Sequence, residues 1–373
     1  MSDRYVVGNN PHNEGNGSPP HDPHTPVANP PARAVGSVEV EAVPPTIAEG
    51  FIGEAVSGVA PTLDSTHLEQ IARRVLASRG VNISELTIGQ QLKKPSNLRR
   101  RPLRDVLEAS TRFTPRISAL RAGPAPESII GGDERKRIFD TNQYPYSAIA
   151  SLEITAHDNS QWLGTGWFVS PRVLVTAGHC VFIQAAENPI AGGWVQSIRV
   201  VPGRNGTGDG SEPFDSAVAT TFRSVTGWVN DGSEEHDYGV LVLDTPLGAG
   251  TGAFSIGVYS DADLLNMDLS VAGYPADKGD PNRDPSTNVA ELNTLWYDTK
   301  AINRVTDNKV FYDIDTYGGE SGAPVFVADA NGSLRTAVAI HAYGTSQGEN
   351  SNSGTRINQE VYKTILDWKA QFS

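Results

Sequence analysis

A histidine, an aspartate and a serine stand in local settings that suit nucleophilic catalysis in this 373-residue sequence. His179 follows the β-like run RVLVTAG, and Ser321 lies in the glycine-rich stretch GGESGAPV. Glycine-rich turns can aim backbone N–H groups at one point, where they stabilise a developing negative charge. Asp237 begins the strongly apolar run DYGVLVLD. Taken singly, each residue also fits a structural role: a histidine beside a strand, a serine in an ordinary turn, a carboxylate at a strand start.

Short β-rich runs, which would have to position these three residues, dominate the sequence after residue 128. They are YPYSAIASLEI, QWLGTGWFVS, RVLVTAGH, WVQSIRVVP, YGVLVLD, SVAGYP, KVFYDID, GAPVFVAD and TAVAIHAYG. Turn-rich segments such as GRNGTGDGSEP separate them, and no helices alternate with them, so the pattern predicts an antiparallel barrel or sandwich. In the final segment, NQEVYKTILDWKAQF, Val361, Ile365 and Trp368 share one helical face, which predicts a C-terminal helix packed on the β core.

The first 127 residues have a different composition. Residues 1–62 are rich in Pro, Gly, Asn and Ser and are predicted to be a disordered lead. Residues 63–127 form a basic segment that contains one predicted helix, in HLEQIARRVLASRG, and PAPESIIGG marks the boundary with the β domain over 128–373. Histidines of the lead, interpreted as solvated tail residues rather than metal ligands, are His12, His21 and His24.

Charge and cysteine content exclude several classes of protein. The net charge of −13 argues against nucleic-acid binding. Residues 1–127 carry a net charge of +1 and residues 128–373 one of −14, so the basic segment is expected to dock on the acidic domain in a salt-sensitive way. No apolar run is long enough to predict a membrane span, and no signal peptide is visible. Cys180, the single cysteine, is interpreted as a small buried apolar side chain.

The three candidate residues gain specificity from their order along the chain. TAGHC, DYGVLVL and GESGAPV follow one another as His, Asp and Ser, and together they resemble the chymotrypsin-like serine proteases. The resemblance implies two antiparallel β-barrels. It also implies that Ser321 attacks the scissile carbonyl, that His179 accepts its proton, and that Asp237 orients the imidazole. The N–H groups of Gly319 and Ser321 would form the oxyanion hole.

A closer resemblance is to the glutamyl endopeptidases, the V8-like branch of that fold. Three stretches carry it: SIIGGDERKRIFDT, DTYGGESGAPVF, and AIHAYG followed by GTRI. It covers residues 128–373 and not residues 1–127. It implies cleavage after Glu, and less readily after Asp, with the substrate carboxylate bound by Thr316, His341 and the freed α-amino group of Ser128. A carboxylate entering a pocket needs such donors, because desolvation is otherwise costly.

The same resemblance implies an inactive precursor, with 63–127 as a prosegment that binds the protease domain. We expect processing between Glu127 and Ser128, because a Glu-specific enzyme could then mature itself. Cleavage after Ser128 is the alternative; it would expose a trypsin-like IIGG terminus whose amine Glu320 could receive. In disulfide-bearing relatives Cys180 would pair with a cysteine near Gly164, and this chain has none there.

Two alternative functions stay open at this point. Asp315 stands six residues before Ser321, where trypsin-like enzymes keep the acid that binds Lys or Arg, although we interpret it as structural. The other is a catalytically silent β module that binds peptides. No metal or organic cofactor is expected; a structural calcium ion is left open, without an Asp-rich loop of suitable spacing. The expected partners are polypeptide substrates, for a monomer that the resemblance implies is secreted.

Overall fold

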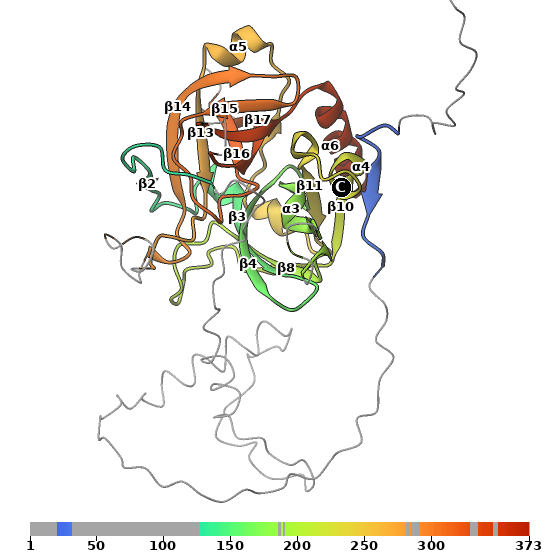
Figure 1. Ribbon diagram of the computed structural model, residues 1–373. Helices are drawn as coiled ribbons and strands as arrows, with labels where there is room; N and C mark the ends of the chain where they lie inside the picture. The colour runs from blue at the N-terminus through green and yellow to red at the C-terminus, as the bar shows by residue number, and fades with distance from the viewer. Residues whose placement is uncertain are drawn as a thin grey trace, which may run out of the picture. The chain divides into compact units, whose positions relative to one another are not determined.

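The computed structural model describes residues 21–31, 127–185, 188, 191–280, 284, 286, 291–328, 335–345 and 350–372. The predicted helix in HLEQIARRVLASRG, and all of the basic segment except Glu127, lie outside these residues. Two eight-stranded sheets account for most of the described chain (Figure 1).

The first sheet contains His179 and Asp237 at the ends of two neighbouring strands. Every pairing in it is antiparallel. Its strands are, in spatial order, β1 (Pro26–Ala28), β10 (Thr221–Val225), β11 (Gly239–Val242), β5 (Val173–Thr176), β4 (Gln161–Phe168), β3 (Ile149–Thr155), β8 (Ser197–Pro202) and β9 (Ala217–Ala219). Its strands enclose one apolar core that includes Leu152, Phe168, Leu174, Ile198, Phe222 and Leu241.

The second sheet closes on itself because β17 pairs with both β16 and β18. The strands, in spatial order, are β12 (Ser255–Ile256), β17 (Arg335–Tyr343), β16 (Pro324–Ala328), β13 (Asp268–Gly273), β14 (Trp296–Val305), β15 (Lys309–Tyr312) and β18 (Asn352–Arg356), with β2 (Lys136–Arg137) paired to β14. A small separate sheet joins β6 (Phe182–Ile183) and β7 (Gly193–Trp194). The six strands from β17 round to β18 therefore form a closed barrel.

The helical elements among the described residues are short, apart from the last. They are η1 (Tyr146–Ala148), α3 (Gly178–Val181), α4 (Thr226–Val229), η2 (Glu234–His236), η3 (Leu247–Gly250), α5 (Asp261–Leu265) and α6 (Gln359–Phe372). In α6 the predicted face is buried: Val361, Ile365 and Trp368 pack into the core. Trp368 lies 5.9 Å from the ring of Tyr238. Within the described part of the chain, no helix has the length and apolar character needed to cross a membrane.

Two continuous apolar runs, in β5 and β11, are explained by burial on both faces of the sheet. Successive side chains of a strand point to opposite faces. Leu174 and Leu241 accordingly enter the core of the first sheet, whereas Val175 and Val240 enter a second core. That second core also contains Phe326 and Ile340 of the closed barrel and residues of α6. The two strands that precede His179 and follow Asp237 are therefore fixed from both sides.

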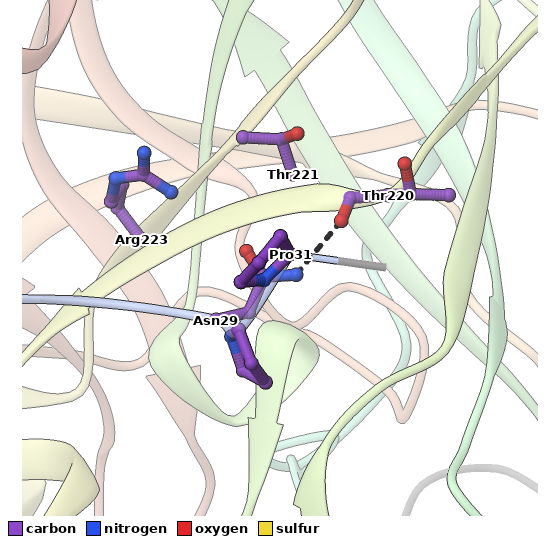
Figure 2. A pocket seen from close by; sticks show the side chains of 6 residues that line it. Asn29, Pro31, Thr220, Thr221 and Arg223 are labelled. Atoms are coloured by element: carbon purple, nitrogen blue, oxygen red, sulfur yellow. Dashed lines mark hydrogen bonds between the residues drawn. The ribbon is translucent and has the colours of Figure 1, made fainter. Parts of the chain in front are cut away.

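These observations confirm the predicted all-β architecture of two antiparallel barrels with a C-terminal helix. One local prediction is wrong: residues 21–31, placed in the disordered lead, form an ordered segment that contains β1 and pairs with β10. Asn29 ends this strand by donating a hydrogen bond to the carbonyl of Thr220 (Figure 2). The remainder of residues 1–62 lies outside the described part of the chain.

Candidate active site

His179 lies at the start of α3, directly after β5, where its ring meets Asp237. The imidazole Nδ1 is 2.7 Å from Asp237 Oδ2, and the backbone N–H of His179 donates to Asp237 Oδ1 at 2.8 Å. Gly178 makes this approach possible, because a Cβ at that position would lie only 2.8 Å from Asp237 Oδ1. Glycine at position 178 therefore allows the Asp237 carboxylate to reach both the backbone N–H and the Nδ1 atom of His179.

The Asp237 carboxylate is fully buried between η2 and β11. Burial by itself would lower the pKa of His179, but the adjacent charge of Asp237 outweighs it and raises that pKa well above its ordinary value. The other ring nitrogen, Nε2, is buried and has no hydrogen-bond partner among the described residues. His179 thus has one nitrogen held by a carboxylate and the other unengaged.

Ser321 sits in a turn whose backbone conformation requires glycine at positions 319 and 322. Gly319 and Gly322 have φ angles of +107° and +87°, in the region that disfavours a side chain. A Cβ on Gly322 would lie 2.1 Å from Thr176 Oγ1, and one on Gly319 would lie 2.6 Å from the carbonyl oxygen of Tyr274. The backbone N–H groups of Gly319 and Ser321 donate to no described residue.

The Ser321 hydroxyl is engaged by Glu127 rather than by His179. Ser321 Oγ donates to Glu127 Oε1 at 2.5 Å, and the glutamate side chain is almost completely buried. Burial raises the pKa of Glu127 to about 7, even though the hydrogen bond from Ser321 and the charge of His179 act in the opposite direction. The predicted processing residue therefore places its own carboxyl group on the predicted nucleophile.

His341, on β17, faces the same carboxyl group. Its Nε2 lies 3.7 Å from Glu127 Oε1, and its Nδ1 lies 2.7 Å from the hydroxyl of Tyr312. Burial, followed by the charge of His179, lowers the pKa of His341 to about 3, so its ring is neutral. Burial also raises the pKa of Tyr312, so its hydroxyl stays protonated and is able to donate to Nδ1. The His341 proton then resides on Nε2 and points toward the carboxyl group.

Thr316 and Ser128 complete the surroundings of Glu127. Thr316 Oγ1 is buried without a hydrogen-bond partner in the described structure, and its backbone N–H donates to the carbonyl of Ser128 at 3.3 Å. Asn352 holds Ser128 from both sides: its Oδ1 accepts from the Ser128 N–H at 3.1 Å and its Nδ2 donates to the Ser128 carbonyl at 2.6 Å. The structure thus brings Ser321 and His341 to one carboxyl group, and Thr316 and Asn352 bond the backbone of the residue that follows it.

Tyr312 and Asn352 were not identified from the sequence. Tyr312 ends the apolar run KVFY and has the composition of a core residue, and Asn352 lies in a polar stretch without a motif. Their roles depend on strand pairing: β15 pairs with β18, and β18 pairs with β17, which carries His341. Only the position of these strands in the fold could have indicated that the two residues belong to the site.

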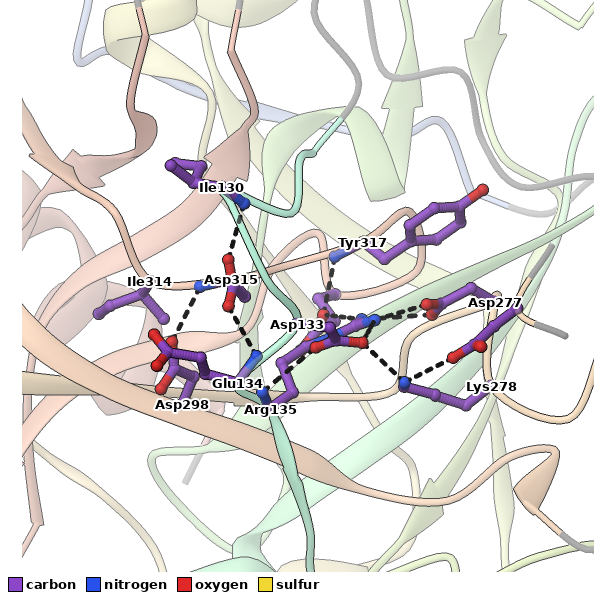
Figure 3. A network of polar contacts seen from close by, with 12 residues as sticks. Ile130, Asp133, Glu134, Arg135, Asp277, Lys278, Asp298, Ile314, Asp315 and Tyr317 are labelled. Carbon is purple, nitrogen blue, oxygen red and sulfur yellow. Dashed lines mark hydrogen bonds and ion pairs between the residues drawn. The ribbon is translucent and has the colours of Figure 1, made fainter. Parts of the chain in front are cut away.

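Asp315 serves the backbone of the segment that follows Ser128. Its two oxygens accept hydrogen bonds from the N–H groups of Ile130 at 2.7 Å and Glu134 at 2.9 Å (Figure 3). Lys300 Nζ approaches at 3.5 Å. The carboxylate is therefore occupied within the domain, which supports the interpretation of Asp315 as structural.

Glu320 is likewise engaged. Its Oε2 accepts from Arg135 at 3.3 Å and from the N–H of Tyr317 at 2.8 Å. Arg135 also bonds Asp277 at 2.5 Å. Arg135, and not a chain terminus, is thus the cationic partner of Glu320 in this structure.

Three carboxylates come together beside this arginine. Asp133, Asp277 and Asp284 lie close enough for a shared cation. Lys278 Nζ, however, bonds Asp133 at 2.8 Å and Asp284 at 2.7 Å, while Arg135 bonds Asp133 and Asp277. The cluster is a network of ion pairs that its own side chains balance, so these residues do not have the character of a metal site.

Cys180 is buried in the apolar core of the first sheet, as predicted. Its Sγ lies 3.6 Å from the carbonyl oxygen of Ser321. A Cβ added to Gly164 would lie 3.0 Å from that sulfur, so Gly164 marks the point where a second cysteine would meet it.

Comparison with known proteins identifies a sequence family and several relatives that this chain resembles. The sequence profile of the family described as Trypsin matches residues 129–368. An extracellular metalloprotease of Bacillus subtilis is 36% identical over 247 residues, which are 66% of this chain and 71% of that protein. A glutamyl endopeptidase of Bacillus licheniformis is 33% identical over 255 residues, which are 68% of this chain and 72% of that one.

A solved structure is similar as well. The structure of a Glu endopeptidase in complex with MPD matches with a TM-score of 0.53 and 27% sequence identity. The match covers 65% of this chain and 99% of that one. The similarity therefore extends over a whole chain of that structure.

Proposed function

This chain belongs to the trypsin-like family of serine proteases, and on that premise we propose that it is a glutamyl endopeptidase made as an inactive precursor. His179, Asp237 and Ser321 are its catalytic triad in this proposal, and 128–373 is its protease domain. The name of one relative, a glutamyl endopeptidase, supports a Glu-specific protease, and the name of another, an extracellular metalloprotease, supports an extracellular location.

The proposed mechanism is acyl transfer to water. Ser321 Oγ attacks the scissile carbonyl carbon while His179 Nε2 takes the hydroxyl proton, and the imidazolium then protonates the leaving amine as the C–N bond breaks. Water, deprotonated by His179, hydrolyses the acyl-enzyme. Asp237 holds the ring and stabilises its charge through Nδ1. The unengaged N–H groups of Gly319 and Ser321 are suited to bind the oxyanion, each contributing about 3 kcal/mol.

The single observation that carries Glu specificity is the position of Glu127. The precursor holds a glutamate carboxyl group against Ser321 and His341, and the buried Thr316 Oγ1 has no hydrogen-bond partner among the described residues. A substrate glutamate would find the same groups: the Nε2–H of His341 and the hydroxyl of Thr316. Cleavage before Ser128 would add the positive charge of a new α-amino group, close to the carboxylate that needs it.

The same contact supports latency of the precursor. A serine nucleophile is activated when its hydroxyl donates to the catalytic imidazole. In the precursor that hydroxyl donates to Glu127, and His179 Nε2 has no partner among the described residues. The side chain of Glu127 also fills space that a substrate glutamate would need. Both effects end when Glu127 leaves the pocket.

The test is proteolysis by the full chain, followed during its maturation. Purified precursor is incubated and then assayed on peptides that differ only at the residue before the cut: Glu, Gln, Asp or Lys. We expect a new N-terminus at Ser128 and cleavage after Glu at least tenfold faster than after Asp. The Ser321→Ala chain should lose about a millionfold in kcat.

The other outcomes decide between the alternatives. Cleavage after Lys would keep the triad and assign specificity to Asp315. A first residue of Ile129 would overturn the Glu127–Ser128 processing site. Folded and processed protein that cleaves none of the peptides, and that an active-site serine probe leaves unlabelled, would replace the enzyme with a peptide-binding module.

A further inference from the structure

The outer edge of β10 is covered by a segment from the far N-terminal end of the chain, residues 21–31. Pro26 lies opposite Val225 and Ala28 opposite Arg223 in an antiparallel register. The contact continues beyond the strand, because the N–H of Gly227 donates to the carbonyl of Pro23 at 2.8 Å. The segment therefore binds as an added strand, a mode in which main-chain hydrogen bonds supply much of the affinity.

Asn29 anchors one end of this segment. Its side-chain Nδ2 donates to the carbonyl of Thr220 at 2.8 Å, and its Oδ1 accepts from the N–H of Phe222 at 2.8 Å. Figure 2 shows the hydrogen bond between the Asn29 side chain and Thr220, with Pro31 beside it. Both functional groups of one amide are thus satisfied by the backbone of the protease domain, which is a sequence-specific contact.

His24 anchors the other end, beside the loop that carries Asp237. Its Nδ1 lies 3.0 Å from the hydroxyl of Tyr238, and its ring lies 4.9 Å from that of His236 in an edge-on arrangement. His24 was interpreted from the sequence as a solvated tail residue, which is wrong, since it is half-buried in this contact. The docked segment therefore reaches both neighbours of Asp237 in the sequence.

The composition of residues 21–31 suits a peptide that binds without a covalent link to the protease domain. Four of its residues are prolines, which restrict the free peptide to extended conformations and lower the entropic cost of binding. Proline also lacks an N–H group, so a further strand cannot add to this edge at those positions. The prolines are Pro23, Pro26, Pro30 and Pro31.

We propose that the edge of β10, from Thr220 to Gly227, is a peptide-docking site whose occupant is the segment 21–31. The contacts described above are made by the segment itself, so we infer that it stays bound after the chain is cut between residue 31 and the protease domain. This part of the N-terminal lead then remains on the protease as a non-covalent ligand. This inference does not depend on Glu specificity or on the triad.

Acid should weaken the docking. Burial lowers the pKa of both His24 and His236 in the docked state, so docking favours their neutral forms. Their docked pKa values lie below the ordinary 6.5, and the binding free energy is therefore fully present above pH 6.5 and declines as the pH falls below it. Carboxylates that moderate the effect are Asp22, Asp231, Glu235 and Glu360. The pair of His21 with Asp231, 2.9 Å apart, also faces this contact but is exposed and screened by solvent.

The experiment uses the full chain carrying Ser321→Ala, with a recognition sequence for an unrelated, sequence-specific protease inserted after Pro45. After cutting at that sequence, gel filtration at pH 7.5 and mass spectrometry show whether the piece that contains 21–31 elutes with the domain. We expect co-elution at pH 7.5 and at least severalfold weaker retention at pH 5. Asn29→Ala should weaken retention by about 10- to 30-fold, because it removes two side-chain hydrogen bonds.

A matched control is Ala28→Ser, which changes an exposed side chain of the same strand and should bind as the parent does. Separate elution of the parent piece at pH 7.5 would overturn the proposal, and so would equal retention of the Asn29→Ala and Ala28→Ser pieces. Equal retention at pH 7.5 and pH 5 would refute the role of His24 and His236. Because the cut is made by another protease on an inactive chain, failure here is independent of the proposed enzymatic function.

Discussion

The two halves of the active site differ in how far their hydrogen bonds are satisfied. In the first barrel, both oxygens of the Asp237 carboxylate contact His179. In the pocket half, buried polar atoms lack hydrogen-bond partners among the described residues at Thr316 Oγ1, His341 Nε2 and Glu127 Oε2. Unpaired buried polar groups are costly. The pairing of Asp237 with His179 is therefore complete in the precursor, although His179 Nε2 has no partner among the described residues. The pocket half, in contrast, is arranged for a carboxylate and an amine that only cleavage and substrate supply.

The largest expected effect tests the completed half. Asp237→Asn should lower kcat about 10⁴-fold, because an amide that donates to Nδ1 holds the imidazole in the wrong tautomer. Steady-state kinetics on protein processed by added wild-type enzyme measure this loss. Asp244→Asn, at the exposed end of the same apolar run, is the control and should leave kcat unchanged. A loss below tenfold would remove Asp237 from the triad.

A second test introduces a disulfide bond into the half of the active site that contains His179. The position of Cys180 Sγ, 3.0 Å from a Cβ at Gly164, predicts that Gly164→Cys forms a disulfide. Closing a loop of this size should stabilise the fold by about 3 kcal/mol. Urea unfolding with and without reductant measures the gain, and Gly164→Ser is the control. If the half is already complete, catalytic activity should change by less than threefold; two free thiols by titration would contradict the geometry.

A third test concerns the unfinished half and its pH dependence. Burial raises the pKa of Glu127 from 4.5 to about 7, so the folded precursor binds this proton more tightly than the unfolded chain does. Its contribution to stability is therefore greatest below pH 4.5 and declines, by up to about 3 kcal/mol, as the pH rises to 7.

The measurement compares chains with and without Glu127→Gln, both carrying Asp237→Asn to slow processing. Urea unfolding between pH 4.5 and pH 7.5 should show a declining difference in favour of the Glu127 chain as the pH rises. Parallel pH profiles for the two chains would show that the carboxyl group is solvated rather than held in the pocket.

The smallest expected effect tests how the pocket selects its ligand. Tyr312→Phe removes the hydroxyl that fixes the His341 tautomer, so the Nε2–H donor is lost in part of the molecules. We expect KM for Glu peptides to rise about tenfold with little change in kcat, and the preference for Glu over Gln to narrow. Tyr362→Phe, on α6, is the control. An unchanged Glu-to-Gln ratio would exclude a positioning role for Tyr312.

The sequence was sufficient to predict the strands that carry motifs and the C-terminal helix. It did not predict β14, because the run WYDTKAINRV buries few of its side chains and lacks apolar alternation. It missed Tyr312 and Asn352 for a related reason: their roles arise from strand pairing between β15, β18 and β17, which no local pattern records. Residues 21–31 were misjudged because proline-rich composition is typical of disorder, yet the backbone of β10 supplies the partners that this segment cannot supply for itself.

The hydrogen bonds between Asn352 and Ser128 have a consequence for the rate of maturation. Both backbone groups of Ser128 are already bound before any cut. If the peptide bond between Glu127 and Ser128 is broken as proposed, the new amine forms inside its own binding site, with no diffusive search and no loop to reorganise. The time course from cut chain to competent pocket would then be governed by departure of Glu127 from the pocket, a first-order process that dilution of the protein does not slow.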